Sequence, residues 1–530
     1  MTTSLWQGTF DVPSFPALER DSSVDVCVVG AGIAGLSTAY MLAKAGQRVV
    51  VLDDGPIGGG ETGHTTAHLT AAFDDRIFAL EQVHGETAAR RIVESHTAAI
   101  NRIEQIVGLE GIACDFQRVD GFLFLGPDDD EALLDRELAA ARRAGLADVM
   151  KTDRAPIADW DSGPALRFPW QGQLHALKYI AGLAEALVRA GGRIYCDTHV
   201  SSVKGGRSCT VTIDKRHTVK AAAVCVCTNS SITDMVQTHV KAAPYRTYVI
   251  AATVPRGSVA TALYWDTPHP YHYVRVQPLD EPYPGVLAGD AQYDALIVGG
   301  EDHKTGHADD ADDRWRRLEE WMRQRWPVAR EVTYRWSGQV IEPADYAAFI
   351  GPNPDGAKNV YMAGGDSGQG MTHGTVAGIL LTDLILGHPN PWAEVYDPRR
   401  VSLRVAPLEE MAKENLDVAF QFVRGYAGPS DVSSEDEIPR GEGRVIRRGL
   451  HRLAVYRDES GTLHERSAVC THLKCTVAWN SAERSWDCPC HGSRFDPYGR
   501  VLNGPAVTDL EPAAEPTPAR TKRVKRKERA

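Results

Sequence analysis

The feature that most constrains the fold of this chain is a pattern of cysteines and histidines in its last hundred residues. Residues 470–475 read CTHLKC and residues 488–493 read CPCHGS, so a Cys-x-His pair is followed, after a spacer of fifteen residues, by a Cys-x-x-His pair. Thiolates and imidazoles at such short spacings are typical of a metal site in two neighbouring loops. The four candidate ligands are Cys470, His472, Cys488 and His491.

Two kinds of metal site use these donors, a structural zinc ion and an iron–sulfur cluster with mixed ligands. Each pair holds one cysteine and one histidine, whereas a zinc site usually takes its cysteines from one pair and its histidines from the other. In the cluster, two thiolates hold one iron and two neutral imidazoles hold the other, which raises the reduction potential. A further cysteine stands at a matching place in each loop, Cys475 and Cys490. The pattern favours the cluster, with zinc as the alternative.

This stretch resembles, almost residue for residue, the Rieske proteins of cytochrome bc complexes. The resemblance implies an all-β domain with a Rieske [2Fe-2S] cluster, and a disulfide between Cys475 and Cys490 that ties the loops together. Ser493 matches a serine whose hydroxyl points at a bridging sulfide, but Phe495 stands where high-potential members have a tyrosine hydroxyl directed at a ligand sulfur. Because donors to sulfur stabilise the reduced cluster, we expect a potential below the top of the Rieske range, which lies at about +300 mV.

Length and composition bound the rest of the protein. A chain of 530 residues is too long for one hydrophobic core, so two or three domains are expected. The net charge of −12 argues against nucleic acid as a partner. We expect no secretory signal, no transmembrane segment and a cytoplasmic location, because no basic and apolar leader and no long apolar run is present. Six cysteines among apolar neighbours are expected to be small buried hydrophobes: Cys27, Cys114, Cys196, Cys209, Cys225 and Cys227.

A second motif lies near the start of the chain. Residues 24–29 predict a buried β-strand, residues 33–45 have apolar positions at helical spacing, and residues 48–53 predict another strand. The turn between the first strand and the helix reads GAGIAG (30–35), and Asp53 ends the second strand. Glycines at these places let a pyrophosphate approach the helix N-terminus, and the acid accepts hydrogen bonds from ribose hydroxyls. The β-α-β unit therefore predicts a dinucleotide site.

Residues 24 to about 390 resemble the D-amino-acid oxidase, glycine oxidase and sarcosine oxidase superfamily of FAD enzymes. The matching pieces are VCVVGAGIAGLSTAYMLAKAGQRVVVLD, GGGETGHTTAHL, QGQLHALKYIAGLAEALVRAGGRIYCDTHV, AAAVCVCTNSSI and NVYMAGGDSGQGMTHGTVAG. The resemblance implies an α/β fold, with a Rossmann-like FAD-binding domain and an inserted antiparallel β-rich substrate domain. Noncovalent FAD is expected, because members that attach FAD through a histidine of the GHTTAH loop place that histidine differently. The residues expected to contact FAD are Gly30, Gly32, Ile33, Ala34, Gly35, Asp53, Asp54, Thr62, Gly63, His64, Thr65, Thr66, Val200, Thr228, Gly364, Gly368, Gln369, Gly370, Met371 and Thr372.

Composition shifts along the chain predict the domain boundaries. The runs YRTYVIAATV, YHYVRV and ALIVGG predict an antiparallel sheet, LEEMAKENLDVAFQFV a helix, and GPSDVSSEDEIPRGEG a linker. The basic TKRVKRKERA has too little apolar content to pack. The expected segments are an N-terminal extension (1–23), the FAD-dependent oxidoreductase domain (24–395) with insertions at about 111–165 and 245–335, a helical segment and linker (396–431), the Rieske domain (432–515) and a basic disordered tail (516–530).

The inserted sheet is expected to cover the flavin and to select the substrate. Candidate catalytic residues are Tyr248, Tyr273 and Arg275, together with His64 of the GHTTAH loop. Strand alternation in YHYVR (271–275) puts Tyr273 and Arg275 on one face. A guanidinium there could bind a carboxylate through two parallel hydrogen bonds.

The two resemblances together imply an FAD-dependent dehydrogenase that oxidises a C–N bond of a small amine or amino acid. Electrons would pass from the flavin to the cluster and on to an external acceptor, a quinone or a small redox protein. Two alternatives are a reductase, in which an external donor feeds the flavin through the cluster, and a redox-responsive module without turnover. A Rieske oxygenase is not expected, because no sequence follows the cluster motif to form a mononuclear iron domain.

Overall fold

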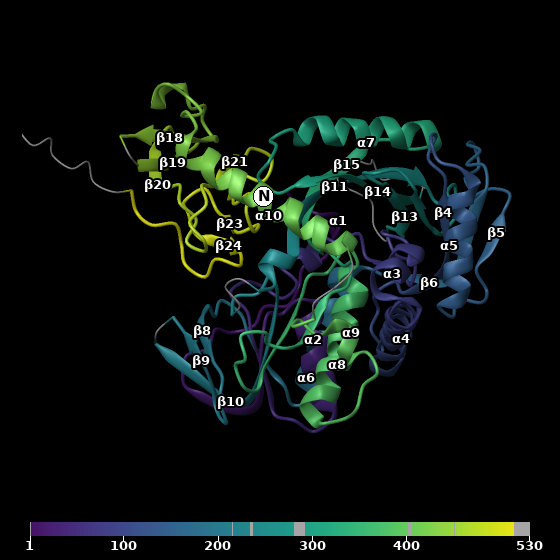
Figure 1. The fold of residues 1–530 in the computed structure, drawn as a ribbon, viewed down its shortest axis with the longest axis horizontal. Coiled ribbons are helices and arrows are strands. Elements are labelled where there is room, and N and C mark those ends of the chain that lie inside the picture. Colours follow the sequence, from purple (N-terminus) through teal and green to yellow (C-terminus); the bar gives the residue numbers. More distant parts are fainter. Residues whose placement is uncertain are drawn as a thin grey trace, which may run out of the picture.

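The structure is a computed structural model that describes residues 2–214, 216–233, 237–279, 292–400, 405–449 and 451–513. Within these residues the chain forms two large β-sheets with their helices and two small sheets at the C-terminal end (Figure 1). The expected basic tail (516–530) lies outside the described residues. None of the described helices is long and apolar enough to cross a membrane.

The first large sheet has a parallel core. Its described strands are β1 (Ser22–Val29), β2 (Val49–Leu52), β7 (Arg193–Tyr195), β8 (Val200–Lys204), β9 (Cys209–Ile213), β10 (His217–Asn229), β16 (Phe349–Pro352) and β17 (Val360–Gly364). They run in the order β16-β17-β10-β1-β2-β7, and β9, with β8 beside it, pairs with β10. Strand β1 pairs in parallel with β2 and β10, and its last four residues are buried on both faces. Burial on both faces explains why these strands read as continuous apolar runs.

Helices of the FAD domain pack against this sheet and against each other. They are α2 (Ile33–Lys44), α3 (Ile77–His84), α4 (Glu86–Glu110), α6 (Ala176–Arg189), α8 (Gly370–Leu386) and α9 (Ala393–Tyr396), preceded by the short α1 (Leu5–Thr9). Figure 1 shows α2, α6 and α8 gathered beside the first sheet. The sequence RIYCDTHV is divided between β7 and β8, and between them Asp197 takes a left-handed backbone conformation with a φ of 47°.

The second large sheet is mainly antiparallel. Its described strands are β3 (His68–Leu69), β4 (Gln117–Phe124), β5 (Met150–Thr152), β6 (Ala165–Gln173), β11 (Ala242–Pro255), β12 (Leu263–Asp266), β13 (Tyr273–Pro278), β14 (Tyr293–Lys304) and β15 (Val332–Pro343). They run in the order β15-β11-β14-β13-β12-β4-β6-β3, with β5 beside β6. Helix α7 (Ala311–Arg325) covers one face, where Trp315 and Leu318 enter a core with Ile250 and Val298 (Figure 1). Helix α5 (Glu131–Arg143) packs near β5. The expected antiparallel sheet is confirmed.

The C-terminal domain consists of two small antiparallel sheets and follows the long helix α10 (Val405–Ala427) (Figure 1). The first sheet holds β18 (Gly443–Arg448), β19 (His451–Arg457) and β20 (Leu463–Ser467), and the second holds β21 (Ala478–Asn480), β22 (Ser485–Asp487), β23 (Arg494–Phe495) and β24 (Val501–Asn503). The loop 470–475 lies between β20 and β21, and the loop 488–493 between β22 and β23. The polar segment before β18 is bound to it, since Asp431 and Val445 exchange two hydrogen bonds of 2.7 and 2.9 Å.

Candidate functional site

A cavity of about 1260 Å³ is bordered by both large sheets and by the C-terminal domain. Its wall includes the ends of β1 and β2, the start of α8, and residues of β13 and β15. Leu502, Gly504 and Val507 of the C-terminal domain complete it. Pockets for drug-sized ligands typically measure roughly 300–1,000 Å³, so this cavity has room for a large cofactor and for a smaller molecule beside it.

Most of the residues expected to contact FAD line this cavity. These are Gly30, Gly32, Ile33, Ala34, Asp53, Asp54, Thr62, His64, Thr65, Thr66, Val200, Thr228, Gly364, Gly368, Gln369, Gly370 and Met371. Gly35, Gly63 and Thr372 lie behind the wall. A Cβ on Gly35 would lie 1.8 Å from the carbonyl oxygen of Gly30, and one on Gly63 would lie 2.6 Å from that of Gly58. These glycines therefore permit close approaches of the backbone rather than touching the cavity.

The glycine turn opens the N-terminus of α2 towards the cavity. Gly30 has a φ of 104°, and a Cβ there would lie 2.5 Å from the carbonyl oxygen of Cys227. Gly32 is the N-cap and offers no side-chain cap, while the N–H of Ile33 donates to Oγ1 of Thr62 at 3.1 Å. A bare helix N-terminus with glycines on its cavity side is suited to a pyrophosphate.

Asp53 ends β2 at the edge of the cavity. Its carboxylate accepts hydrogen bonds from the N–H groups of Ala31 at 2.5 Å and Gly55 at 2.9 Å. Burial raises the pKa of Asp53 to about 7, although these two bonds oppose the shift. Donors from ribose hydroxyls would favour the charged form, so the residue fits the role expected of it at an adenosine ribose.

The loop 62–66, which lines the cavity, is held in place through its backbone carbonyls. Nε1 of Trp6 donates to the carbonyl of Thr65 at 2.5 Å, and Nε1 of Trp336 donates to that of His64 at 2.9 Å. Arg275 donates to the carbonyl of Thr66 at 3.1 Å. Three buried donors from distant parts of the chain thus set the position of the second loop.

The structure separates the four candidate catalytic residues. Tyr273 and His64 line the cavity. Tyr248 does not: on β11, Thr247 faces the cavity, so alternation turns Tyr248 to the opposite face, where its ring packs at 5.7 Å from those of His303 and Trp315.

Arg275 is also outside the cavity wall. Its side chain is fully buried, and Nη1 donates to the carbonyls of Thr66, Ala67 and Leu174, while Nη2 donates to Gln277. Burial lowers the pKa of Arg275 to about 9. The guanidinium supports the 62–66 loop, and the expected binding of a substrate carboxylate by Arg275 is not supported, because the side chain lies outside the cavity wall and both of its terminal nitrogens donate to protein oxygens.

Four carboxylates that the sequence analysis did not single out line the far part of the cavity. We call them the acid cluster: Asp74, Asp75, Asp302 and Glu342. Burial is the main cause that raises the pKa of each, to about 7 for Asp75 and Asp302, and the mutual repulsion of the carboxylates adds to it. The four residues come from a loop and from β14 and β15, so no local spacing indicates the cluster; the pair Asp74-Asp75 after an apolar run is the only signal in the sequence.

The candidate metal ligands of the C-terminal domain lie together. The thiols of Cys470 and Cys488 are buried and hydrogen-bonded to each other, which lowers the pKa of Cys470 to about 7. The rings of His472 and His491 are 5.1 Å apart. Within the described residues, Nδ1 of His491 is buried without a hydrogen-bond partner, and burial lowers the pKa of this ring to about 3, so it is neutral and able to bind a metal.

The two ligand loops are joined by a disulfide between Cys475 and Cys490, as expected. Sulfurs of both lie within 4.8 Å of Cys488, but a disulfide offers no thiolate, so these two cysteines are not ligands. Backbone bonds within the loops, from Cys470 to Cys475 and from Cys488 to Ser493, are both 2.8 Å long. Two thiols and two imidazoles at the tips of linked loops match the donor set of a Rieske cluster.

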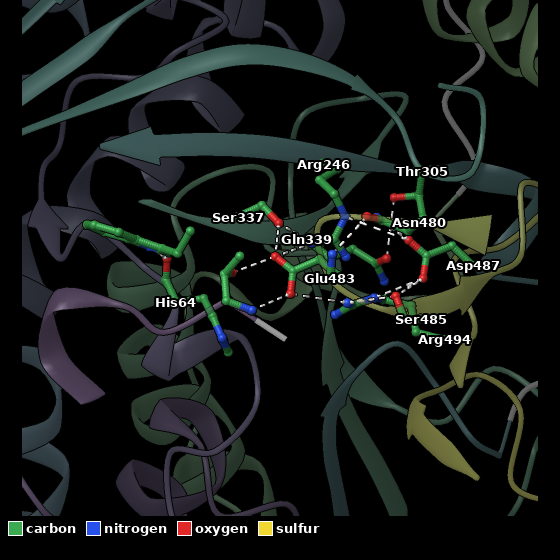
Figure 2. Close-up of polar contacts among 12 residues, drawn as sticks. His64, Arg246, Thr305, Ser337, Gln339, Asn480, Glu483, Ser485, Asp487 and Arg494 are labelled. Carbon is green, nitrogen blue, oxygen red and sulfur yellow. Dashed lines mark hydrogen bonds and ion pairs between the residues drawn. The ribbon is translucent and has the colours of Figure 1, made fainter. Parts of the chain in front are cut away.

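A buried ionic network holds the C-terminal domain against the second large sheet (Figure 2). Arg246 of β11 lies 4.0 Å from Glu483 and 3.9 Å from Asp487, and it donates to Oγ of Ser337 at 2.6 Å. Ser337 donates in turn to Glu483 at 2.5 Å, and Arg494 reaches Asp487 at 3.2 Å. Since the charged residues are at most 5% exposed, the network is closed to water.

The same interface covers the two ligand histidines. His472 and His491 are each 8% exposed, and the ring of His239 lies 4.9 Å from the first and 5.8 Å from the second. His239 begins a short helical turn (His239–Lys241) of the FAD domain, and the next residue, Val240, lines the cavity. This turn therefore contacts the ligand histidines through one residue and the cavity through the next.

Fold and site define the class of this protein. The chain belongs to the FAD dependent oxidoreductase family, whose profile matches residues 25–384, and it carries a Rieske [2Fe-2S] domain, matched over residues 429–514. Its cofactors are accordingly FAD, for which the glycine cradle, Asp53 and the cavity fit, and a [2Fe-2S] cluster, for which the donor set fits. The zinc alternative is wrong. The six scattered cysteines are all buried, as expected.

Other proteins share one or both of these domains. A Rieske 2Fe-2S iron-sulfur protein of Bacillus subtilis, YhfW, is 33% identical over 509 residues, which cover 96% of each chain. The gamma-glutamylputrescine oxidoreductase of Escherichia coli is 27% identical and covers 70% of this chain and 86% of its own. Among solved structures, glycine oxidase from Geobacillus kaustophilus superposes with a TM-score of 0.57 at 17% identity, over 72% of this chain and 100% of its own, which supports the fold alone.

Proposed function

We propose that this protein is an FAD-dependent dehydrogenase that oxidises a C–N bond of a small amine or amino acid and passes the electrons through its Rieske cluster to an external acceptor, a quinone or a small redox protein. In this proposal Cys470 and Cys488 hold one iron, His472 and His491 hold the other, and Tyr273 faces the substrate. FAD supplies an acceptor for the hydride of the carbon next to nitrogen, and the cluster supplies a carrier of single electrons.

The observation that carries the proposal is the position of the ligand histidines. They are nearly covered, and His239 of the FAD domain contacts both rings, while the next residue, Val240, lines the same cavity as the flavin motifs. A cluster that only exchanged electrons with outside partners would not need its histidine edge covered by this domain. The arrangement supports direct electron transfer between the two cofactor sites.

The shape of the cavity supports turnover of a small molecule over a purely redox-responsive role. Beyond the residues of the flavin motifs it continues to Trp265 of β12, Tyr273 of β13 and Tyr271 of the loop that joins these strands. Thr247 and Tyr273 are joined by a hydrogen bond of 2.6 Å between their hydroxyls. Aromatic walls with a few oriented polar groups are typical of a substrate site. A cytoplasmic location and noncovalent FAD remain predictions from the sequence.

The proposal is tested with the full-length protein under anaerobic conditions, with a panel of amines and amino acids. Flavin absorbance and the EPR signal of the reduced cluster are followed together. Bleaching of the flavin by a substrate, followed by the cluster signal, is the expected result. Reduction by an external donor alone would establish the reductase instead, and flavin that stays oxidised with every compound would favour the redox-responsive module.

Two variants separate the steps. Cys488→Ser should abolish the cluster signal and leave bleaching of the flavin intact. His239→Ala should leave bleaching unchanged but slow the appearance of the cluster signal, because it removes the ring that contacts both ligand histidines. An unchanged rate of cluster reduction in His239→Ala, with normal cluster content, would contradict the route through this residue.

A further inference from the structure

The acid cluster lies directly beside the turn expected to hold the flavin. A Cβ placed on Gly368 would lie 2.8 Å from Oδ2 of Asp74 and 3.4 Å from the hydroxyl of Tyr271. That hydroxyl donates to the same carboxylate oxygen at 2.7 Å. The carboxylates thus face the space where a molecule in contact with the flavin has to sit.

The cations near the acid cluster, Arg76 and Arg314, favour its charged form from a distance but do not pair with it directly. No ion pair within the described residues involves any of its four members. Arg76, the nearest cation in sequence, donates instead to the carbonyls of Phe73, Asp74 and Asp266. Lys241, on the cavity wall, donates to the carbonyls of Pro398 and Arg400. The ionised form of a partly buried carboxylate without a paired cation is costly, so a ligand that brings positive charge would stabilise the acid cluster.

Hydrogen-bond acceptors without partners in the cavity also favour a ligand that carries an ammonium group. Gln369 is 5% exposed and lines the cavity, and within the described residues its Oε1 has no hydrogen-bond partner. Oδ1 of Asp302 is likewise buried without a partner there. Both atoms are acceptors, so the missing groups are donors. An ammonium carries several N–H donors and satisfies both requirements.

Aromatic rings complete a site for a cation. Trp265, Tyr271 and Tyr273 line the cavity, and the two tyrosine rings lie 5.5 Å apart. Ring faces attract ammonium groups, more strongly where water is excluded. The cations of the described cavity wall are already engaged: Arg494 is bound to Asp487, and Lys241 and Lys413 have partners of their own. Arg275 and Arg246 lie outside the wall, so a substrate carboxylate finds no free cation there.

We propose that the substrate is a diamine or polyamine: one amino group is oxidised at the flavin, the other ammonium is held by the acid cluster and the tyrosine rings, and the molecule carries no carboxylate. This inference rests on the proposed function. In the reaction the C–H bond next to the reacting nitrogen breaks, its hydride takes two electrons to FAD, and a proton leaves the nitrogen. Water hydrolyses the resulting imine to an aldehyde and ammonium, and the two electrons pass singly to the external quinone or redox protein.

The test compares three matched compounds with the anaerobic holoenzyme: 1,4-diaminobutane, 1-aminobutane and ornithine. Charge-assisted hydrogen bonds are worth about 1.5–3 kcal/mol, so the diamine should half-saturate flavin bleaching at a concentration at least about tenfold lower than either other compound. Asp302→Asn and Glu342→Gln should each raise the value for the diamine about tenfold, so that the diamine loses its advantage over 1-aminobutane. Asp313→Asn, an exposed acid on α7, is the control.

Binding without turnover gives an independent measurement. 1,4-Bis(trimethylammonio)butane has two positive charges but no N–H donor and cannot form an imine, so it tests the charge and the aromatic rings alone. Calorimetry should detect its binding to the oxidised holoenzyme and weaker binding to Asp302→Asn. If ornithine or another amino acid bleaches the flavin at lower concentration than the diamine, and Asp302→Asn and Glu342→Gln do not change this order, the inference is wrong while the proposed function stands. If no compound bleaches the flavin but the dication binds, the proposed function fails and the cation site stands.

Discussion

Replacement of Arg246 by methionine should loosen the C-terminal domain from the FAD domain. The side chain is 1% exposed, and it is one of two arginines, with Arg494, that face the buried carboxylates of Glu483 and Asp487. Methionine fills similar space without charge or donors, so both carboxylates keep only Arg494. Removal of one partner from a buried ion pair typically costs about 3–5 kcal/mol.

The pKa of Glu483 gives a second route to the magnitude. Burial opposes its ionised form, but Arg246 and Arg494, with hydrogen bonds from Ser337 and Thr2, outweigh burial and lower the pKa to about 2. Against an ordinary glutamate pKa of about 4.3, this is worth about 3 kcal/mol at neutral pH. Because Arg246 is the larger of the two charge effects, its loss should remove a large part of this stabilisation through Glu483 alone.

The sign of the pH dependence follows from the lowered pKa. A depressed carboxyl pKa stabilises the folded protein fully above the unfolded pKa of about 4.3, and this stability is lost as the pH falls through the folded pKa of about 2. The difference in stability between the wild type and Arg246→Met should therefore be largest at neutral pH. It should shrink as the pH is lowered from about 5 towards 3.

Denaturant titrations with two probes measure the effect, because a chain with several domains does not unfold in one step. Visible circular dichroism of the cluster reports on the C-terminal domain, and flavin fluorescence reports on the FAD domain. The cluster transition of Arg246→Met should move to lower denaturant, with a smaller shift of the flavin transition. Arg316→Met, which removes an arginine 58% exposed beside Asp313 and Glu320, should change either midpoint little. Equal cluster midpoints in the two variants would refute the reasoning.

Three further variants test other parts of the structure. Gly35→Ala should yield protein without flavin, measured as the absorbance ratio after purification, since its Cβ would meet a backbone oxygen at 1.8 Å; Gly108→Ala, with nothing within 4 Å, should keep normal flavin content. Cys475→Ser should cost the cluster domain about 3 kcal/mol, because the bond closes a loop of 15 residues, and the cluster signal should melt at a lower temperature; equal melting of wild type and variant under oxidising conditions would contradict this. Phe495→Tyr should raise the cluster potential in an EPR-monitored redox titration, because a hydroxyl directed at a ligand sulfur stabilises the reduced state, and an unchanged or lower potential in a fully loaded variant would count against that reason.

The sequence predicted well those parts of the site that are formed by residues close together in the chain. The strand, glycine turn and helix around Gly30 are local, so their residue types alone indicate the fold and the cavity side of the turn. The two cysteine–histidine loops are equally compact, and each carries its ligands within four residues. Strand alternation also placed Tyr273 on the side that faces the cavity.

The parts that sequence did not predict depend on distant segments meeting. Alternation put Arg275 on the same face as Tyr273, but it could not show that carbonyls of Thr66, Ala67 and Leu174 would take up the guanidinium. The sequence did not indicate the acid cluster for the same reason. Its members are separated by up to about 270 positions and come together only in the folded protein.

Glu483 and Asp487 show how a contact with a distant segment changes the role of a residue. In the sequence they are ordinary charged positions of a small β-domain, where acids are mostly exposed. In the structure they are 2% and 1% exposed, and their burial is tolerable only because Arg246, more than two hundred residues away, reaches them beside Arg494. If the C-terminal domain separated from the FAD domain, it would lose Arg246. Glu483 and Asp487 would then share Arg494 alone, and water would have to solvate the remaining negative charge. The network therefore favours the docked arrangement, and the docked arrangement is what brings His472 and His491 against His239.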